Sequence, residues 1–188
     1  MKQTRIAIQQ TFVTLAMEKP VDKITVKEIV KRCGINRNSF YYHYEDLPDL
    51  IQSIIEDQID EAVEENKSQG IQQICMGAAR VFQNNLDFCR NVYSSKNRDI
   101  LEMRLSRKIA RLVEDYLLKE FIPNYSISEE DKQIILQFYR TQLYGLIKEW
   151  LRAGMNYDIA KRFERMFELR QGSLERMLQI AQKTRKSQ

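Results

Sequence analysis

The 188-residue sequence is short of several residue types, and each shortage excludes a class of function. A single histidine, His43, rules out metal sites that need several histidines. The three cysteines, Cys33, Cys75 and Cys89, show no CxxC spacing and predict buried packing residues rather than a redox or metal centre. No glycine-rich phosphate loop is present, because the six glycines are isolated. We therefore expect no metal, no cofactor and no enzyme; catalysis by a carboxylate pair is a distant alternative.

Six glycines and three prolines, beside 43% hydrophobic and 30% charged residues, are typical of a mostly helical globular protein. The apolar content is too high for a disordered chain. No apolar run approaches the roughly 18 residues that a membrane span needs, and the first residues lack the core of a signal peptide. We expect a cytoplasmic protein that does not enter a membrane.

The net charge of +4 is unevenly distributed along the chain. Residues 1–44, which we call the head, carry eight basic and three acidic side chains, whereas residues 45–65 carry nine acidic side chains and no basic one. This pattern predicts a head that meets a polyanion, followed by a segment that does not. The alternative is an ordinary set of solvated helix faces.

Apolar spacing predicts a helix over residues 2–18 with one buried face. Thr25 and Glu28 have the spacing of a reciprocal capping box at the start of a second, short helix, which ends at Gly34. Asn36 can cap a third helix over 36–44 after a turn of about three residues. Its predicted buried residues, and those of the first helix, are Ile8, Phe12, Leu15, Ala16, Phe40 and Tyr44.

Two short helices joined by a tight turn that contains glycine form a helix-turn-helix, whose second helix enters the major groove of DNA. Arg37 can bond guanine and Asn38 can bond adenine, each through two hydrogen bonds. Donors suited to phosphate oxygens are Lys27, Ser39, Tyr41 and His43. The alternative is a small core with tyrosines at its edge.

The remaining pattern predicts helices over Glu45–Asn66, 71–87, 98–121, 128–154 and 158–184, without strands. The predicted fold is all-α, with about nine helices. A three-helix domain containing the helix-turn-helix occupies residues 1–48, and a helical regulatory and dimerisation bundle occupies 49–188, with Glu45–Asn66 as the connector.

The stretch Thr25–Leu50, TVKEIVKRCGINRNSFYYHYEDLPDL, resembles the N-terminal domain of TetR-family transcriptional regulators. In that family, Gly-Val-Ser is followed by Thr-Leu-Tyr and by His-Phe, and here Gly34-Ile35-Asn36, Ser39-Phe40-Tyr41 and His43-Tyr44 stand in those places. The run Gly145–Trp150 more weakly resembles regulators of the dihydroxyacetone kinase type.

The resemblance implies that Arg37, Asn38 and Tyr42 read bases, with Asn36 at the start of the same DNA-contacting helix. It also implies that Lys27, Ser39, Tyr41 and His43 touch phosphate or adjoining base edges. One departure is Leu47, which stands where the family usually has a lysine that contacts phosphate. We therefore expect one phosphate contact fewer.

The two predicted C-terminal helices carry more apolar residues than one core face needs, which favours half of a four-helix bundle formed by two copies of the chain. A wholly internal core is the alternative, and resemblance to the family implies the dimer. The predicted interface residues are Phe138, Leu143, Ile147, Trp150, Phe163, Phe167, Leu174 and Met177.

Family members often bind a small molecule among their middle helices and then release DNA. Candidate lining residues for such a pocket are Phe82, Phe88, Tyr93, Met103, Leu112, Tyr116, Phe138 and Tyr139, each of which is more typical of a plain core than of a pocket wall. The sequence thus predicts a DNA-binding regulator with double-stranded DNA, a second copy and a small-molecule effector as partners, more in keeping with a repressor than an activator. The alternative is a helical co-regulator that binds a protein partner and no longer binds DNA.

Overall fold

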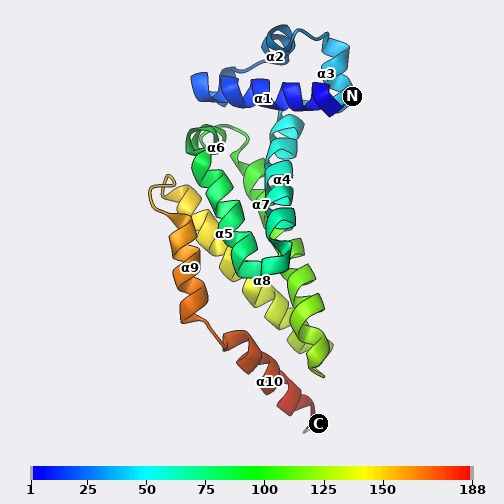
Figure 1. The fold of residues 1–188 in the computed structure, drawn as a ribbon, viewed down its shortest axis with the longest axis vertical. Helices are drawn as coiled ribbons and strands as arrows, with labels where there is room; N and C mark the ends of the chain where they lie inside the picture. Colours follow the sequence, from blue (N-terminus) through cyan, green and yellow to red (C-terminus); the bar gives the residue numbers. More distant parts are fainter. Residues whose placement is uncertain (1, 187–188) are drawn as a thin grey trace. The chain divides into compact units, whose positions relative to one another are not determined.

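The structure, a computed structural model, describes residues 2–186 and shows ten α-helices and no strand within that range (Figure 1). The predicted all-α fold is confirmed. None of the helices in the described range is both long and apolar enough to cross a bilayer. The helices are α1 (Lys2–Glu18), α2 (Val26–Cys33), α3 (Arg37–His43), α4 (Leu47–Asn66), α5 (Ile71–Asn84), α6 (Leu86–Tyr93), α7 (Arg98–Tyr116), α8 (Glu129–Arg152), α9 (Ile159–Leu169) and α10 (Ser173–Lys186).

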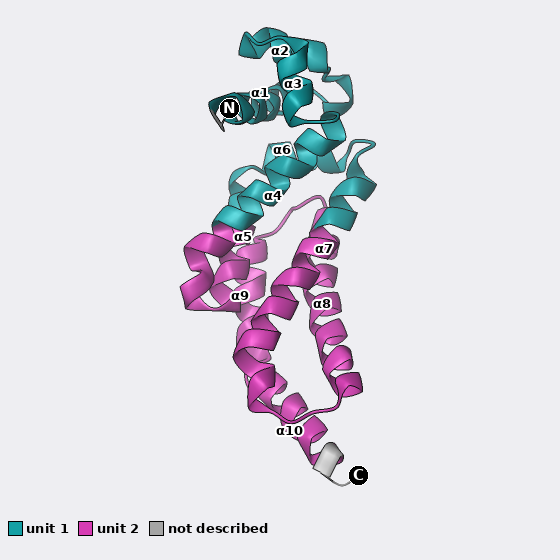
Figure 2. Cartoon of the chain, turned by 90° about the vertical axis from the view of Figure 1, so that its right-hand side faces the viewer, with its two compact units in different colours: residues 1–61, 81–104 teal, residues 62–80, 105–188 magenta. Residues whose placement is uncertain are grey.

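The helices group into two compact units (Figure 2). Unit 1 comprises residues 1–61 and 81–104, and unit 2 comprises residues 62–80 and 105–188. Unit 1 includes helix α6 as well as the N-terminal helices, because α6 packs against α1. The units therefore cut across the two predicted domains, whose boundary stays a prediction.

The caps predicted for the short helices of unit 1 are present. The Thr25 hydroxyl accepts from the Glu28 backbone N–H at 3.3 Å, and α2 ends at Gly34, whose φ of 68° is a left-handed conformation that favours glycine. The reciprocal half of the predicted capping box is wrong, however. The Glu28 carboxylate accepts instead from the Lys19 ammonium at 2.5 Å, because the end of α1 brings a cation within reach.

Helix α1 is the platform of unit 1: α2 and α3 lie on one side of it, and α6 packs against it from another (Figure 1). Its predicted apolar face is buried, with Ile8 and Phe12 completely inaccessible. The Phe12 ring meets the Phe88 ring of α6 edge-on, with 6.3 Å between ring centres. A residue far along the chain thus completes the core beneath the head.

The side chain of Asn91, in α6, holds the end of α1 in place. Its amide nitrogen donates to the backbone oxygens of Ala16 at 2.6 Å and Lys19 at 2.7 Å, and its oxygen accepts from the Val21 backbone N–H at 3.1 Å. The last carbonyls of a helix have no partner within the helix, and Pro20 prevents α1 from continuing. One asparagine therefore satisfies three backbone groups that the chain turn leaves open.

Unit 2 is built from long helices, of which α7 and α8 lie side by side (Figures 1 and 2). An ion pair of 2.9 Å joins Arg140 of α8 to Glu114 of α7. Two helix predictions need correction. Residues 86–93 form a separate helix, α6, and the predicted helix over 158–184 is two helices. The break between these last two helices lies at Arg170–Gly172, where Gly172 adopts a φ of 77° that ends regular helix geometry.

Replacing Asn91 with alanine should lower the free energy of unfolding by about 1–3 kcal/mol. Three backbone groups would lose their hydrogen-bond partner, while the apolar side chains around them would be unchanged. Urea denaturation followed by circular dichroism measures this change. Asn84→Ala is the matched control, since Asn84 is exposed at the last position of α5. If the two variants unfold at the same urea concentration, the Asn91 hydrogen bonds do not support the head.

Candidate nucleic-acid interface

Helix α3 presents one buried and one exposed face. Its buried face is anchored by Phe40 within the helix and by Tyr44 directly after it, which are 0% and 3% exposed. The Asn36 side chain caps its first turn and accepts from the Ser39 backbone N–H at 2.8 Å and from the Ser39 hydroxyl at 3.0 Å. The helix is therefore fixed at both ends, and its orientation on unit 1 is set by packing.

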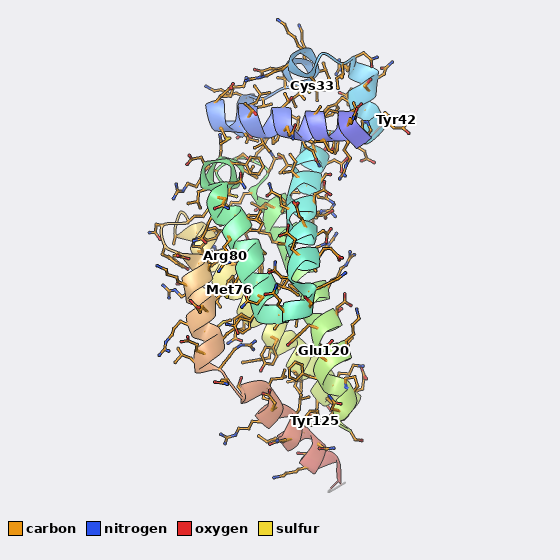
Figure 3. The ribbon with its side chains drawn as sticks, in the orientation of Figure 1. Cys33, Tyr42, Met76, Arg80, Glu120 and Tyr125 are labelled. Carbon is orange, nitrogen blue, oxygen red and sulfur yellow. The ribbon has the colours of Figure 1, made fainter. Side chains whose placement is uncertain are left out.

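The exposed face of α3 carries two pairs of side chains spaced four residues apart. Arg37 donates to the Tyr41 hydroxyl at 3.1 Å and lies 5.4 Å from the centre of that ring, so the two side chains form one polar surface. Asn38 is exposed beside Tyr42, whose side chain is 69% exposed. Figure 3 shows Tyr42 on the outer side of α3. These are the residues for which we predict contacts with base edges.

The remaining predicted DNA-contacting residues surround this face. Ser39 and His43 are half-buried, and the His43 ring meets the Tyr42 ring edge-on with 5.0 Å between centres. Lys27 is exposed on α2, the helix that precedes the turn. Asn36 has its side-chain oxygen engaged by the cap, so its structural role is to start α3.

Some basic side chains of the head are paired with carboxylates, and others have no acidic partner. Arg32 is paired with Glu18 through two hydrogen bonds of 2.6 Å, which raise the pKa of Arg32, and Lys19 is paired with Glu28. Exposed cations with no carboxylate partner among the described residues are Lys23, Lys27, Lys31 and Arg37. Such unpaired surface cations are the groups that displace counterions from DNA phosphates.

The start of α4 does not resemble a phosphate site. The Asp46 carboxylate accepts from the Asp49 backbone N–H at 2.8 Å, and the Asp49 carboxylate accepts from the Glu45 backbone N–H at 2.9 Å. Asp46 thus caps the first turn of α4, and Asp49 holds the backbone just before the helix, so the Asp49 N–H is already engaged where a phosphate would otherwise bind. Leu47, the first residue of the helix, is half-buried.

Comparison with known families agrees with this geometry. Residues 13–54 match the bacterial regulatory proteins of the tetR family, and residues 69–172 match the C-terminal region of transcriptional regulators, which is more than half of the chain. The chain belongs to the TetR family. The resemblance found from Thr25–Leu50 is thereby confirmed, and this TetR-family protein is a DNA-binding transcriptional regulator and not an enzyme.

Solved structures share the fold along almost the whole chain. The dihydroxyacetone kinase operon activator DhaS superposes with a TM-score of 0.74 at 18% identity, covering 97% of this chain and 99% of its own. NalD, the secondary repressor of the MexAB-OprM multidrug efflux pump in Pseudomonas aeruginosa, superposes with a TM-score of 0.59 at 17% identity, covering 94% of this chain and 96% of its own. A TetR regulator from Rhodococcus sp. RHA1 gives 0.58 at 16% identity, covering 89% and 96%. At these identities the likeness establishes the fold.

The interface residues predicted for a TetR-type dimer are only partly on the surface. Trp150 and Phe163 are each 2% exposed within one chain, and the Trp150 indole donates to the Tyr157 backbone oxygen at 2.9 Å. Leu143 and Leu174 are also buried, so these four residues pack in the core of unit 2 within one chain, and their place in a dimer interface stays a prediction. Ile147, Phe167 and Met177 are half-buried, and Phe138 is 48% exposed.

The predicted ligand-pocket residues are divided between the two units. Tyr116 and Tyr139 line a cavity of about 290 Å³ in unit 2. Phe88 belongs instead to the core beneath α1, and Met103 is 42% exposed. The members of the predicted set outside this cavity are Phe82, Phe88, Tyr93, Met103, Leu112 and Phe138. Four of them lie within residues 81–104, which pack in unit 1.

Sequence reasoning missed two polar residues that matter for the sites. Asn91, which fixes α1, has no local signal, because its partners lie about 70 positions away. Arg170 lines the unit 2 cavity, and its only signal was its position as an interruption in the predicted helix over 158–184. Cys75 and Cys89 are buried as predicted, whereas Cys33 is half-buried. Burial raises the pKa of both Cys75 and Cys89 to about 12, so these two thiols stay protonated near neutral pH.

Arg37→Ala and Asn38→Ala should each weaken binding to the preferred DNA site by about 1–3 kcal/mol and relax specificity at one position of each half-site. Fluorescence anisotropy with the preferred site and single-base variants of it measures both effects. Arg111→Ala, at an exposed arginine of α7, removes the same charge far along the sequence from α3 and should leave specificity unchanged. Wild-type affinity and specificity in both α3 variants would show that α3 does not read bases.

Leu47→Lys should add a phosphate contact if the start of α4 faces DNA. The dependence of log affinity on log salt concentration would then steepen by about 0.9 per subunit, or about 1.8 per dimer, equally for specific and random DNA. Leu47→Met keeps the bulk without a charge and serves as the control. An unchanged slope in a variant that melts normally would show that residue 47 does not approach the phosphates.

Proposed function

We propose that this protein is a homodimeric, sequence-specific repressor that binds a palindromic operator and is released by a small molecule. The observation that carries the proposal is the exposed face of α3, where Arg37 and Asn38 stand next to each other in sequence on a helix held by packing. Their side chains have the donors and acceptors that distinguish guanine and adenine in the major groove. As a regulator of bacterial genes the protein acts beside the chromosome, in the cytoplasm.

Dimerisation is supported by apolar side chains that the chain itself leaves uncovered on α8. Ile134 is 53% exposed and Phe138 is 48% exposed, and Thr141 and Gly145 continue the same exposed face at helical spacing. Apart from the adjoining backbone of α8, no heavy atom of the chain lies within 4 Å of the position that a Gly145 Cβ would take, so a second helix can approach closely there. The opposite face of α8 is the one that packs inside unit 2, through Leu143 and other buried residues.

Repression requires only that a bound dimer obstructs RNA polymerase, whereas activation requires a further surface that recruits it. NalD is a repressor and DhaS is an activator, so the relatives include both signs of regulation. Activation is therefore the second candidate, favoured by the similarity to DhaS along the whole chain. A co-regulator that does not bind DNA is opposed by the unpaired cations Lys27, Lys31 and Arg37.

Selection of bound sequences from a random DNA library tests the proposal directly. A two-fold symmetric site with half-site centres about 10 base pairs apart, or a multiple of that spacing, is the expected result. A promoter carrying the selected site before a reporter then gives the sign of regulation. If no sequence is enriched above its level in the starting library, the proposal is overturned, and the co-regulator that does not bind DNA becomes the favoured function.

Phe138→Glu should convert the dimer into a folded monomer, because an interface would have to desolvate the new charge while the isolated chain leaves it in water. Light scattering coupled to size exclusion gives the mass, and circular dichroism gives the fold. Gln137→Glu, at the adjacent exposed position, is the matched control and should stay dimeric. By contrast, Trp150→Glu should unfold the protein, since Trp150 lies in the core. A wild-type protein that is monomeric at micromolar concentration would rule out the proposed dimer.

A further inference from the structure

A cavity of about 290 Å³ lies inside unit 2, where the end of α7 and the middle of α8 meet the break between α9 and α10. All of its lining residues belong to unit 2. Ligand pockets in proteins usually measure about 300–1,000 Å³, so this cavity is suited to a small molecule. Its walls are mainly apolar and aromatic; they include Val113, Leu117, Phe121, Tyr139, Leu143 and Phe167.

One guanidinium stands among these apolar walls. The Arg170 guanidinium carbon lies 4.4 Å from the centre of the Phe167 ring and 5.0 Å from that of the Tyr139 ring. Contacts with two aromatic rings hold the guanidinium in place without engaging its N–H groups in hydrogen bonds. The Arg170 Nε is buried and has no hydrogen-bond partner among the described residues. A buried donor without a partner is a site that an acceptor on a ligand would satisfy.

The start of α10 adds a second positive feature to the same cavity. Gly172, Ser173 and Leu174 all line it, and the helix begins at Ser173. Gly172 has no side chain that could cap the first turn, and the Ser173 backbone N–H is already bonded to the Arg170 oxygen at 2.9 Å. The next N–H groups of the turn carry the partial positive charge of a helix N-terminus, which favours an anion.

The other polar lining residues are four glutamines, Ser173, Tyr116 and Glu175, and the last two bear on the charge that a ligand can carry. Burial raises the pKa of Tyr116, so its phenol is protonated at neutral pH and carries no charge into the cavity. Glu175, in the first turn of α10, also lines the cavity and is the one carboxylate among its lining residues. Arg170 attracts a negatively charged group and Glu175 repels one, so the two side chains favour a ligand with one anionic group, placed at Arg170, and an uncharged remainder.

We infer that this cavity binds a small aromatic monocarboxylate, whose carboxylate accepts from the Arg170 Nε–H and a neighbouring Nη–H and whose ring lies against the aromatic wall. A carboxylate matches the paired donors of a guanidinium edge in both spacing and plane. All residues of the proposed binding site belong to unit 2. That its occupancy releases DNA rests on the proposed function.

Isothermal titration calorimetry of the full chain with benzoate, benzamide and inorganic phosphate tests the site. Benzoate should bind saturably at millimolar or lower concentration, whereas benzamide, which has the same shape without the charge, should bind about tenfold or more weakly. Phosphate should not compete with benzoate, because it lacks the ring. Equal binding of benzoate and benzamide, preferential binding of phosphate, or no saturable binding of benzoate would overturn the inference without any variant.

Variants locate the site. Arg170→Gln should weaken benzoate binding about tenfold or more. Arg176→Gln removes the same charge from an exposed position of α10 outside the cavity and should leave benzoate binding unchanged. Glu175→Gln should bind benzoate at least as tightly as wild type. Wild-type affinity in a folded Arg170→Gln, or weaker binding in Glu175→Gln, would overturn the assignment; should Arg170→Gln fail to fold, the ligand series on wild type decides.

Anisotropy of the selected operator with and without benzoate tests the coupling separately. Benzoate that binds in calorimetry and lowers operator affinity of wild type but not of Arg170→Gln supports control through this cavity. Benzoate that binds and leaves operator affinity unchanged overturns that control while the site remains. Failure of the protein to bind any selected DNA would instead overturn the proposed function, and the calorimetric result would be unaffected.

Discussion

The DNA-reading part of the molecule depends on the way in which helix α1 ends. Pro20 stops the helix, and the backbone groups left open there are satisfied by the Asn91 side chain from α6. Close by, the Phe12 and Phe88 rings bring the same two helices into apolar contact. Helix α3 has only seven residues and would not be stable alone. Its position therefore derives from α1, and that of α1 derives in part from a hydrogen-bonding residue far along the chain.

The elements with local causes could be predicted from the sequence. Thr25 and Asn36 cap the helices that follow them, and Gly34 takes the left-handed conformation that a tight turn needs. The exposed and buried faces of α3 follow from the helical period, which separates Arg37 from Phe40. The capping arm of Glu28 was mispredicted because its alternative partner, Lys19, is brought near only by folding. Local rules describe a helix end correctly until a tertiary contact offers a stronger partner.

The acidic residues after the head illustrate how one pattern serves two purposes. Net charge alone suggests that residues 45–65 simply avoid a polyanion. In the structure, Asp46 and Asp49 accept from backbone N–H groups at the start of α4, and Asp57 accepts from Arg5 at 2.6 Å and from Gln9 at 2.7 Å of α1. Asp46 and Asp49 therefore stabilise the start of α4, and Asp57 fastens α4 to α1, while all three lower the charge. Of the exposed cations that remain unpaired, Lys23 precedes α2, Lys27 and Lys31 lie on α2, and Arg37 lies on α3, where we expect the base-reading side chains.

The apolar residues of α8 show why periodicity could not separate the core from an interface. Hydrophobicity on a helix reports that a face is buried, but it does not identify which chain buries it. Trp150 and Leu143 are covered within the chain, whereas Ile134 and Phe138, with the same spacing signal, stay about half exposed. Only the three-dimensional packing divides one broad stripe into two faces. The exposed face contains Gly145, and apart from the adjoining backbone of α8 no heavy atom of the chain lies within 4 Å of the position that a Cβ there would take. The backbone of α8 is therefore open at this point to the close approach of another helix, which is the arrangement that the proposed second copy of α8 would provide.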